Sequence, residues 1–217
     1  MGYPKNETSY IQKLIAEGEH QKQDFKFAIS DIRKIAKSIS AFSNTEGGRL
    51  LIGVKDNGKI AGIHSEEEFY MIEAAACRYC SPPVSLQTAI HHLEGKDIME
   101  VIIAESTSKP VYALDEQNKK WAYIRINDEN ILANMTHLNI WKHNNKDQNT
   151  IIVYTQQEQQ LLNILKQHGK LTLNQCCRFT HNNRNTISKI LADFIRFDLI
   201  EQVFQEHTFY FRLKEDK

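Results

Sequence analysis

The sequence is poor in cysteine, proline and glycine, has no excess of either charge, and contains no long apolar run. Four cysteines in 217 residues are too few for a disulfide scaffold, so we expect a reducing, cytoplasmic compartment. No segment reaches the roughly 18 consecutive apolar residues of a membrane span. The first ten residues lack the apolar core of a signal peptide. Lys and Arg number 27, as do Asp and Glu, which argues against a bulk binder of polyanions at the level of the whole chain.

What remains is the composition of an ordinary globular protein, 41% hydrophobic and 25% charged. Residues 143–150 (HNNKDQNT) contain no apolar side chain and are expected to form an exposed linker. Residues 1–149 hold 18 basic and 20 acidic residues, and residues 150–217 hold 9 and 7. We therefore predict two domains, residues 1–142 and residues 151–217, with small net charges of opposite sign.

The first predicted domain mixes helix and strand patterns. Apolar residues at helical spacing indicate a helix that Ser30 begins and Gly47-Gly48 ends. The run RLLIGVK at 49–55 indicates a strand buried on both faces, and Asp56-Asn57-Gly58 predicts a tight hairpin that returns over 59–64. A capping box at Ser65 opens a helix to Tyr79. Strands near 84–92, 97–104 and 121–126 and a closing helix at 134–142 follow. This order predicts an α+β fold.

The second predicted domain has three helical segments followed by two short strands, 201–204 and 208–213. This order is typical of a winged helix-turn-helix, which usually reads DNA with its third helix. Opposite the apolar face of that helix lie residues suited to base edges and phosphates: Asn182, Asn185, Thr186, Lys189 and Arg196, with Arg184 on the flank. Arg212 and Lys214 of the wing can contact phosphates. The alternative for this domain is a protein-interaction or dimerisation module.

Several short motifs occur together in the first predicted domain. Glu19 is followed by Asp24-Phe25-Lys26, then by FSNTEGG at 42–48 and GVKD at 53–56. Later come SKPVY at 108–112 and YIRI at 123–126. In this combination the chain resembles the Alba-like domain of Schlafen proteins and of many bacterial regulators, over residues 11–140. A trailing winged helix is common in the bacterial members.

The resemblance implies two activities. Bacterial members are described as DNA-binding or transcriptional regulators, whereas certain Schlafens cleave tRNA and rRNA with three carboxylates. Those carboxylates fall here on Glu19, Asp24 and Asp56, which would hold Mg²⁺ or Mn²⁺ and activate water, with Lys26 near the phosphate. Position 24 is Asp where a Schlafen has Glu. Schlafens also pair two such lobes in one chain, so a nuclease of this kind would need a dimer.

The sequence also bears on two other ligands, ATP and zinc. No G-x-x-x-x-G-K-[ST] motif occurs, and Gly47-Gly48 leads into a strand, so we expect no ATP binding. The spacing of Cys77 and Cys80 permits zinc with His91 or His92, but small buried thiols are common in an Ala-rich helix, so no metal is assigned there.

The sequence thus favours a DNA-binding transcriptional regulator that acts as a homodimer. In this interpretation the first domain supplies dimerisation, extra backbone contacts through Arg33, Lys34, Lys37 and Arg49, or an effector site. The alternative is a metal-dependent ribonuclease, with RNA in place of DNA. A third hypothesis is an interaction scaffold with neither activity.

Overall fold

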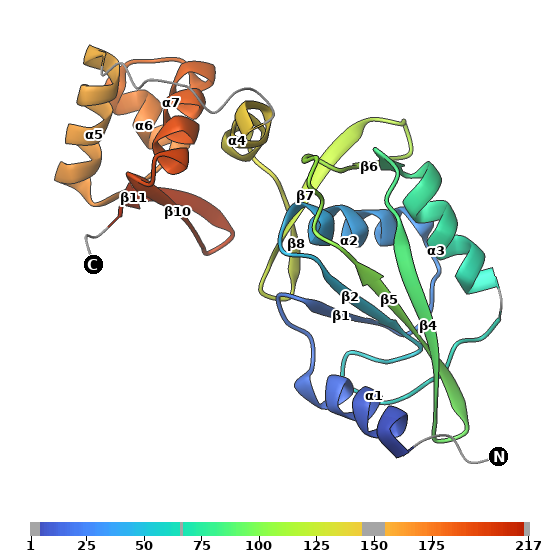
Figure 1. Cartoon of the computed structure of the whole chain (residues 1–217). Helices are drawn as coiled ribbons and strands as arrows, with labels where there is room; N and C mark the ends of the chain where they lie inside the picture. The colour runs from blue at the N-terminus through green and yellow to red at the C-terminus, as the bar shows by residue number, and fades with distance from the viewer. Residues whose placement is uncertain (1–4, 66, 145–154, 215–217) are drawn as a thin grey trace. The chain divides into compact units, whose positions relative to one another are not determined.

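The computed structural model describes residues 5–65, 67–144 and 155–214 (Figure 1). The chain divides into two compact units after Leu132. The first unit is α+β, as predicted. Its elements are α1 (Lys5–Glu17), β1 (Gln23–Lys26), α2 (Ile32–Asn44), β2 (Gly48–Ile52), α3 (Glu67–Arg78), β3 (Cys80–Ser81), β4 (Leu86–Leu93), β5 (Lys96–Ile103), β6 (Tyr112–Leu114), β7 (Lys120–Ile126) and β8 (Glu129–Leu132).

The strands of the first unit form two four-stranded sheets, ordered β1-β2-β5-β4 and β3-β6-β7-β8. Only β1 and β2 run parallel; the other pairs are antiparallel. Helix α2 contacts strands of both sheets, which is why it is buried around most of its circumference. Its apolar side chains, such as Ile39 and Phe42, pack with Leu50 and Val101 of the first sheet in one core cluster.

The other side of α2 is polar and is hydrogen-bonded to the second sheet. The Asn44 amide Nδ2 donates to the carbonyl oxygens of Val111 (2.8 Å) and Tyr123 (2.9 Å), and its Oδ1 accepts from the Val111 N–H at 2.7 Å. Ser40 Oγ donates to the Val111 carbonyl at 2.8 Å and accepts from the Tyr123 N–H at 3.1 Å. Buried polar groups of a helix are therefore satisfied by the backbone of β7 and the segment before β6.

The predicted start of α2 is wrong by one residue. Asp31, not Ser30, is the N-cap, and its Oδ1 accepts from the Arg33 N–H at 2.8 Å. The start of α3 also differs from the predicted capping box. Glu68 accepts from the N–H groups of His64 (2.7 Å) and Ile29 (3.0 Å), and so joins the loop before α3 to the loop before α2.

The hairpin predicted after β2 is also wrong. The turn closes, with the Lys55 N–H bonded to the Lys59 carbonyl at 3.0 Å, but only the isolated bridge Val54–Ile60 follows, and no strand covers 59–64. Strand β2 already has β1 on one side and β5 on the other, so no edge is left for a returning strand.

The second unit contains α4 (Met135–Asn144), α5 (Gln156–His168), β9 (Lys170–Thr172), α6 (Leu173–Thr180), α7 (Arg184–Arg196), β10 (Ile200–Gln205) and β11 (Thr208–Leu213). Its three-stranded sheet has the order β10-β11-β9. The three helices and the hairpin match the predicted elements, while β9 is additional. Leu161, Leu165, Leu191, Phe194 and Phe211 form the centre of its core.

Helix α4 was predicted to close the first domain, but in the structure it belongs to the second unit. It packs against α7, where the Asn139 amide donates to Ser188 Oγ at 3.1 Å, and the His137 ring lies 5.2 Å from the Phe209 ring of β11. The predicted linker at 143–150 lies, apart from its first two residues, outside the described residues. Across the described ranges, every helix is too short or too polar to cross a membrane.

Candidate functional site

The exposed face of α7 is narrower than the sequence predicts. Asn183 caps the helix, accepting from the Thr186 N–H at 2.9 Å. Ile187 and Leu191 point into the core as expected. Ser188 and Ala192 are fully buried as well, on the side where α4 packs. What remains outward at the start and middle of α7 is Arg184, Asn185 and Lys189, all of them exposed.

The other residues predicted to contact nucleic acid are already engaged. Asn182 is half-buried and donates to the Thr180 carbonyl at 3.0 Å, while Thr186 takes part in the cap. Arg196 pairs with Asp193 at 3.3 Å, and Arg212 Nε donates to Glu201 Oε1 at 2.6 Å.

Two acidic side chains near this face are each neutralised by a basic side chain. Asp193 lies against Arg196, and Asp198 pairs with Lys214. The repulsion that these carboxylates would exert on a phosphate backbone is therefore reduced, and the charge of Lys189 stands out on the middle of α7.

A hollow of about 210 Å³ lies beside the start of α7. The start of α6, at Thr172 and Asn174, forms part of its lining, as do Arg184 and the tip of the β10–β11 hairpin at His207 and Thr208. The Arg184 guanidinium donates to Asn174 Oδ1, which holds it at this opening. The sequence pattern missed Asn174, because its role depends on the packing of α6 against α7.

In the first unit, Glu19 and Asp24 lie together. Asp24 is 4% exposed, with Oδ2 at 2.6 Å from Lys26 Nζ and Oδ1 at 3.2 Å from Arg125 Nη2. Glu19 Oε1 accepts from the Phe25 N–H at 2.9 Å. Burial raises the pKa of Glu19, and the hydrogen bond and charge of Asp24 raise it further, against the lowering by the Phe25 N–H.

Asp56 does not complete a three-carboxylate group with this pair. It is an exposed residue of the loop after β2. Among the described residues, no three His, Cys, Asp or Glu side chains are arranged to hold a metal ion. The cysteines are not gathered with histidines either: Cys77 is exposed, whereas burial raises the pKa of the Cys80 thiol to about 12.

Arg125 is the residue of this site to which sequence reasoning gave no role. It is 2% exposed, and its Nη1 donates to Asn130 Oδ1 at 3.0 Å while its Nη2 donates to the Gln23 carbonyl at 3.1 Å. Its guanidinium lies 5.0 Å from the centre of the Phe42 ring. A signal was present in YIRI at 123–126, where one charge interrupts an apolar strand, since a buried charge requires a partner.

The four basic residues proposed for backbone contacts lie at different places in the first unit. Arg49 Nη1 contacts Glu100 Oε1 at 3.3 Å and the Tyr10 hydroxyl at 3.1 Å. Arg33 and Lys37 lie over the rings of Tyr79 and Tyr123 and border a hollow of about 270 Å³ that they share with Asp31, Asp115 and Glu116. Lys34 is exposed.

The fold and these motifs define an α+β domain in which α2 lies between two sheets, and comparison with family models identifies it. Residues 19–134 match the family described as "Schlafen, AlbA_2", so the chain belongs to this family. The matched segment covers more than half of the chain and contains Glu19, Asp24 and Arg125. Family membership indicates a nucleic-acid-related function.

Solved structures that match this chain include the following two. One is the crystal structure of a Corynebacterium diphtheriae protein, which is 14% identical to this chain with a TM-score of 0.45. The match covers 64% of this chain and 28% of the Corynebacterium protein. The other is a solution structure of the N-terminal domain of a RecG-related protein from Nitrosomonas europaea, 20% identical with a TM-score of 0.42, covering 68% of this chain and 95% of that domain. Likenesses of this degree carry no argument about activity. A search of curated proteins finds no match.

Proposed function

We propose that the protein is a DNA-binding transcriptional regulator whose second unit is a winged helix-turn-helix that reads duplex DNA with α7. The observation that supports this most directly is the exposed strip of Asn185 and Lys189, opposite the apolar face of α7, with exposed Arg184 on its flank. Asn pairs with adenine edges, and Arg or Lys with guanine or phosphate, so the strip has the chemistry of major-groove contact.

The surroundings of the strip suit a phosphate backbone. The hollow beside Arg184 includes the first residues of α6, and N–H groups at the start of a helix favour anions. In the proposed complex Arg184 contacts a phosphate there, while the β10–β11 hairpin is the wing. Arg212 and Lys214, which are paired within the unit, would contribute less than Lys189.

The proposal is tested by selecting sequences from a random duplex pool with the full chain and measuring affinity by fluorescence anisotropy at several salt concentrations. Lys189→Ala should weaken binding to all sequences and reduce the salt slope by about one ion. Asn185→Ala should lower discrimination at one base pair by about 1–3 kcal/mol. Lys166→Ala, an exposed lysine of α5, is the matched control and should bind like the wild type. Equal affinity of the Lys189→Ala variant and the wild type would refute the assignment of α7.

A second candidate is a Mg²⁺- or Mn²⁺-dependent ribonuclease, favoured by the proximity of Glu19 and Asp24 beside Lys26. These two carboxylates would hold the ion, which when bound would activate water, and Lys26 would contact the scissile phosphate. Asp56 joins this proposal only if its loop moves towards the pair.

Incubation of tRNA with the protein and Mn²⁺ tests this candidate. Glu19→Gln should abolish cleavage while circular dichroism shows a retained fold. Asp24→Asn should abolish cleavage too, and its stability is measured in parallel because it also removes the charge paired with Arg125. Glu105→Gln, an exposed carboxylate elsewhere in the unit, should cleave like the wild type. Cleavage that persists in the Glu19→Gln variant would remove the pair from the mechanism.

A further inference from the structure

Strand β4 forms one edge of the sheet β1-β2-β5-β4 and pairs with β5 along all of its eight residues (Figure 1). Its sequence, LQTAIHHL, contains no Lys, Arg, Asp, Glu or Pro. Edge strands are usually protected from pairing with another chain by such residues or by being short. The opposite edge, β1, follows that rule, since it has four residues and includes Asp24 and Lys26. The β4 edge is therefore a long strand without the usual protection.

One face of β4 also carries an exposed large apolar side chain. Because side chains alternate along a strand, Ile90 lies on the same face as Leu86 and Thr88, which line a hollow beside α3. Ile90 is 52% exposed. Tyr70 of α3, on the same side, is 64% exposed. Two large apolar side chains thus lie in water next to an unprotected strand edge.

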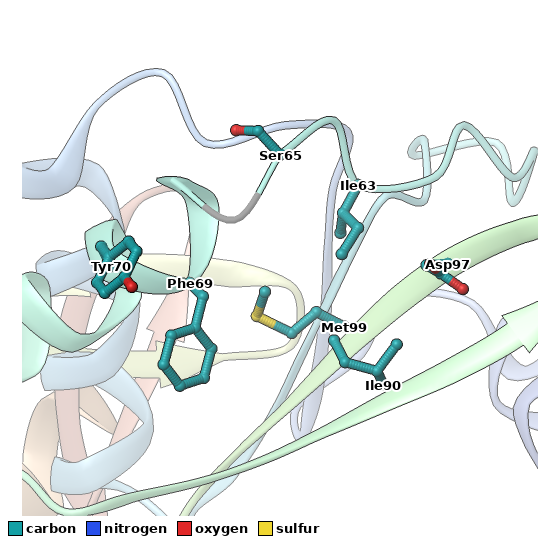
Figure 2. A pocket seen from close by; sticks show the side chains of 7 residues that line it. All are labelled: Ile63, Ser65, Phe69, Tyr70, Ile90, Asp97 and Met99. Carbon is teal, nitrogen blue, oxygen red and sulfur yellow. The ribbon is translucent and has the colours of Figure 1, made fainter.

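A groove runs between α3 and β4 on this face. One part, of about 430 Å³, is lined by Ile63, Phe69, Tyr70, Ile90 and Met99, with Ser65 and Asp97 also in its lining (Figure 2). Figure 2 shows Phe69, Met99 and Ile90 next to one another. A second part, of about 330 Å³, shares Phe69 and continues to Leu86 and Thr88. The groove therefore follows the strand for most of its length.

We propose that β4 pairs antiparallel with β4 of a second copy of this chain, about a two-fold axis at Ile90. A two-fold axis perpendicular to a sheet places residues of the same face opposite each other, so Ile90 of one copy meets Ile90 of the other. Thr88 then lies opposite His92, and Ala89 opposite His91. The two four-stranded sheets become one continuous sheet, and Ile90 leaves water.

The strand's own chemistry favours a second copy over a foreign peptide. In this register Ile90 alone faces its own copy, and it is uncharged; β4 places no Lys, Arg, Asp or Glu along the seam, so no like charges of this kind meet across the axis. Its groove-side residues, Leu86, Thr88 and Ile90, are apolar or small and suit the apolar lining on the partner. The dimer does not depend on the proposed function, since it uses no residue of α7.

Sedimentation equilibrium of the full chain tests the pairing. The wild type should be a dimer, and Ile90→Lys should be monomeric because two ammonium groups meet at the axis. Ile102→Lys is the matched control: Ile102 is 41% exposed but lies on β5, which has a neighbouring strand on each side. This variant should remain dimeric. A mixture of Ile90→Lys and Ile90→Glu should restore the dimer through opposite charges.

Amide hydrogen exchange gives a readout independent of added charge. Every second N–H of β4, on the side away from β5, should exchange more slowly as protein concentration rises. If Ile90→Lys fails to fold, Thr88→Lys, at another exposed position of the strand, replaces it. A monomeric wild type at its solubility limit would overturn the proposal. So would a dimer that a folded Ile90→Lys variant leaves intact, or concentration-independent exchange in β4.

Discussion

Arg125 and Asp24 form a buried ion pair, with Nη2 at 3.2 Å from Oδ1, in which the arginine side chain is 1% exposed and the aspartate side chain 5%. Arg125 lies in β7 and Asp24 in β1, so the pair joins the two sheets. Arg125 also donates to the carbonyl of Gln23 in β1. It fixes the position of Asp24 beside Lys26 and Glu19, so the geometry of the candidate carboxylate site depends on a residue about a hundred positions away in the chain.

Replacing Arg125 should destabilise the first unit strongly. Arg125→Ala removes the buried partner of Asp24, which keeps only the partly exposed Lys26, and removes the contact with the Phe42 ring, so we expect a loss of about 3 kcal/mol in the free energy of unfolding. Urea denaturation measures it. Arg78→Ala, an exposed arginine in the same unit, should change stability by less than about 0.5 kcal/mol. Similar values for both variants would contradict the role given to the pair.

Asn44 should be nearly as sensitive, for a different reason. Asn44→Ala removes the side chain that satisfies both backbone groups of Val111 and the carbonyl of Tyr123, at a cost of about 2–4 kcal/mol. Asn57→Ala, in the exposed turn after β2, is the control and should cost much less. The free energies of unfolding of the two variants are compared by denaturant titration monitored through Trp fluorescence. Equal stability of the two variants would show that α2 is not fixed to the second sheet through this amide.

The second unit should lose stability in mild acid through His137. Burial lowers the pKa of His137 to about 4, from 6.5 in the unfolded chain, so the unfolded state binds the proton first as pH falls. Its contribution is fully present above pH 6.5 and is lost progressively between pH 6.5 and 4. Comparison of unfolding at pH 7 and pH 5 should show a loss of about 1–2 kcal/mol for the wild type.

A His137→Phe variant separates this effect from other acid-sensitive groups. Phenylalanine retains a ring beside Trp141 and Phe209 but does not titrate. The difference in stability between pH 7 and pH 5 should therefore shrink in the variant. An unchanged pH dependence would assign the acid sensitivity to another group.

The packing of α4 on α7 makes a separate prediction. Ala192 is fully buried on the α4 side of α7, so Ala192→Leu should overpack this contact and cost about 1–3 kcal/mol. Asn185→Leu places the same apolar side chain at an exposed position of the same helix and should cost less. Thermal unfolding distinguishes them. A neutral Ala192→Leu variant would mean that α4 leaves α7 readily.

Local patterns predicted most of the elements correctly. The apolar spacing of Ile35, Ile39 and Phe42 indicated α2, and alternation with turn residues indicated the β4–β5 hairpin. The N-caps of α5 and α6, Thr155 and Thr172, have only local partners, because a capping box joins residues three apart. The motif combination was sufficient to indicate the family that the family model confirms.

Apart from the one-residue shift in the cap of α2, the main errors occurred where a segment's partner is distant in sequence. The turn at 56–58 has ideal hairpin residues, yet it is followed by a single bridge and no returning strand, because β5, far along the chain, already pairs with β2. Helix α4 was assigned to the wrong unit because its neighbour α7 lies beyond a polar segment.

The sequence by itself determined the α+β class, most of the helices, and the candidate residues Glu19, Asp24 and Lys189, since these follow from spacings of a few residues and from short motifs. Only the tertiary structure decided which of them meet. It placed Glu19 beside Asp24 and left Asp56 apart, reduced the outward strip of α7 by packing α4 against it, and left β4 at an edge. The physical reason is that burial and strand pairing depend on contacts between distant segments, and each surface can be covered only once.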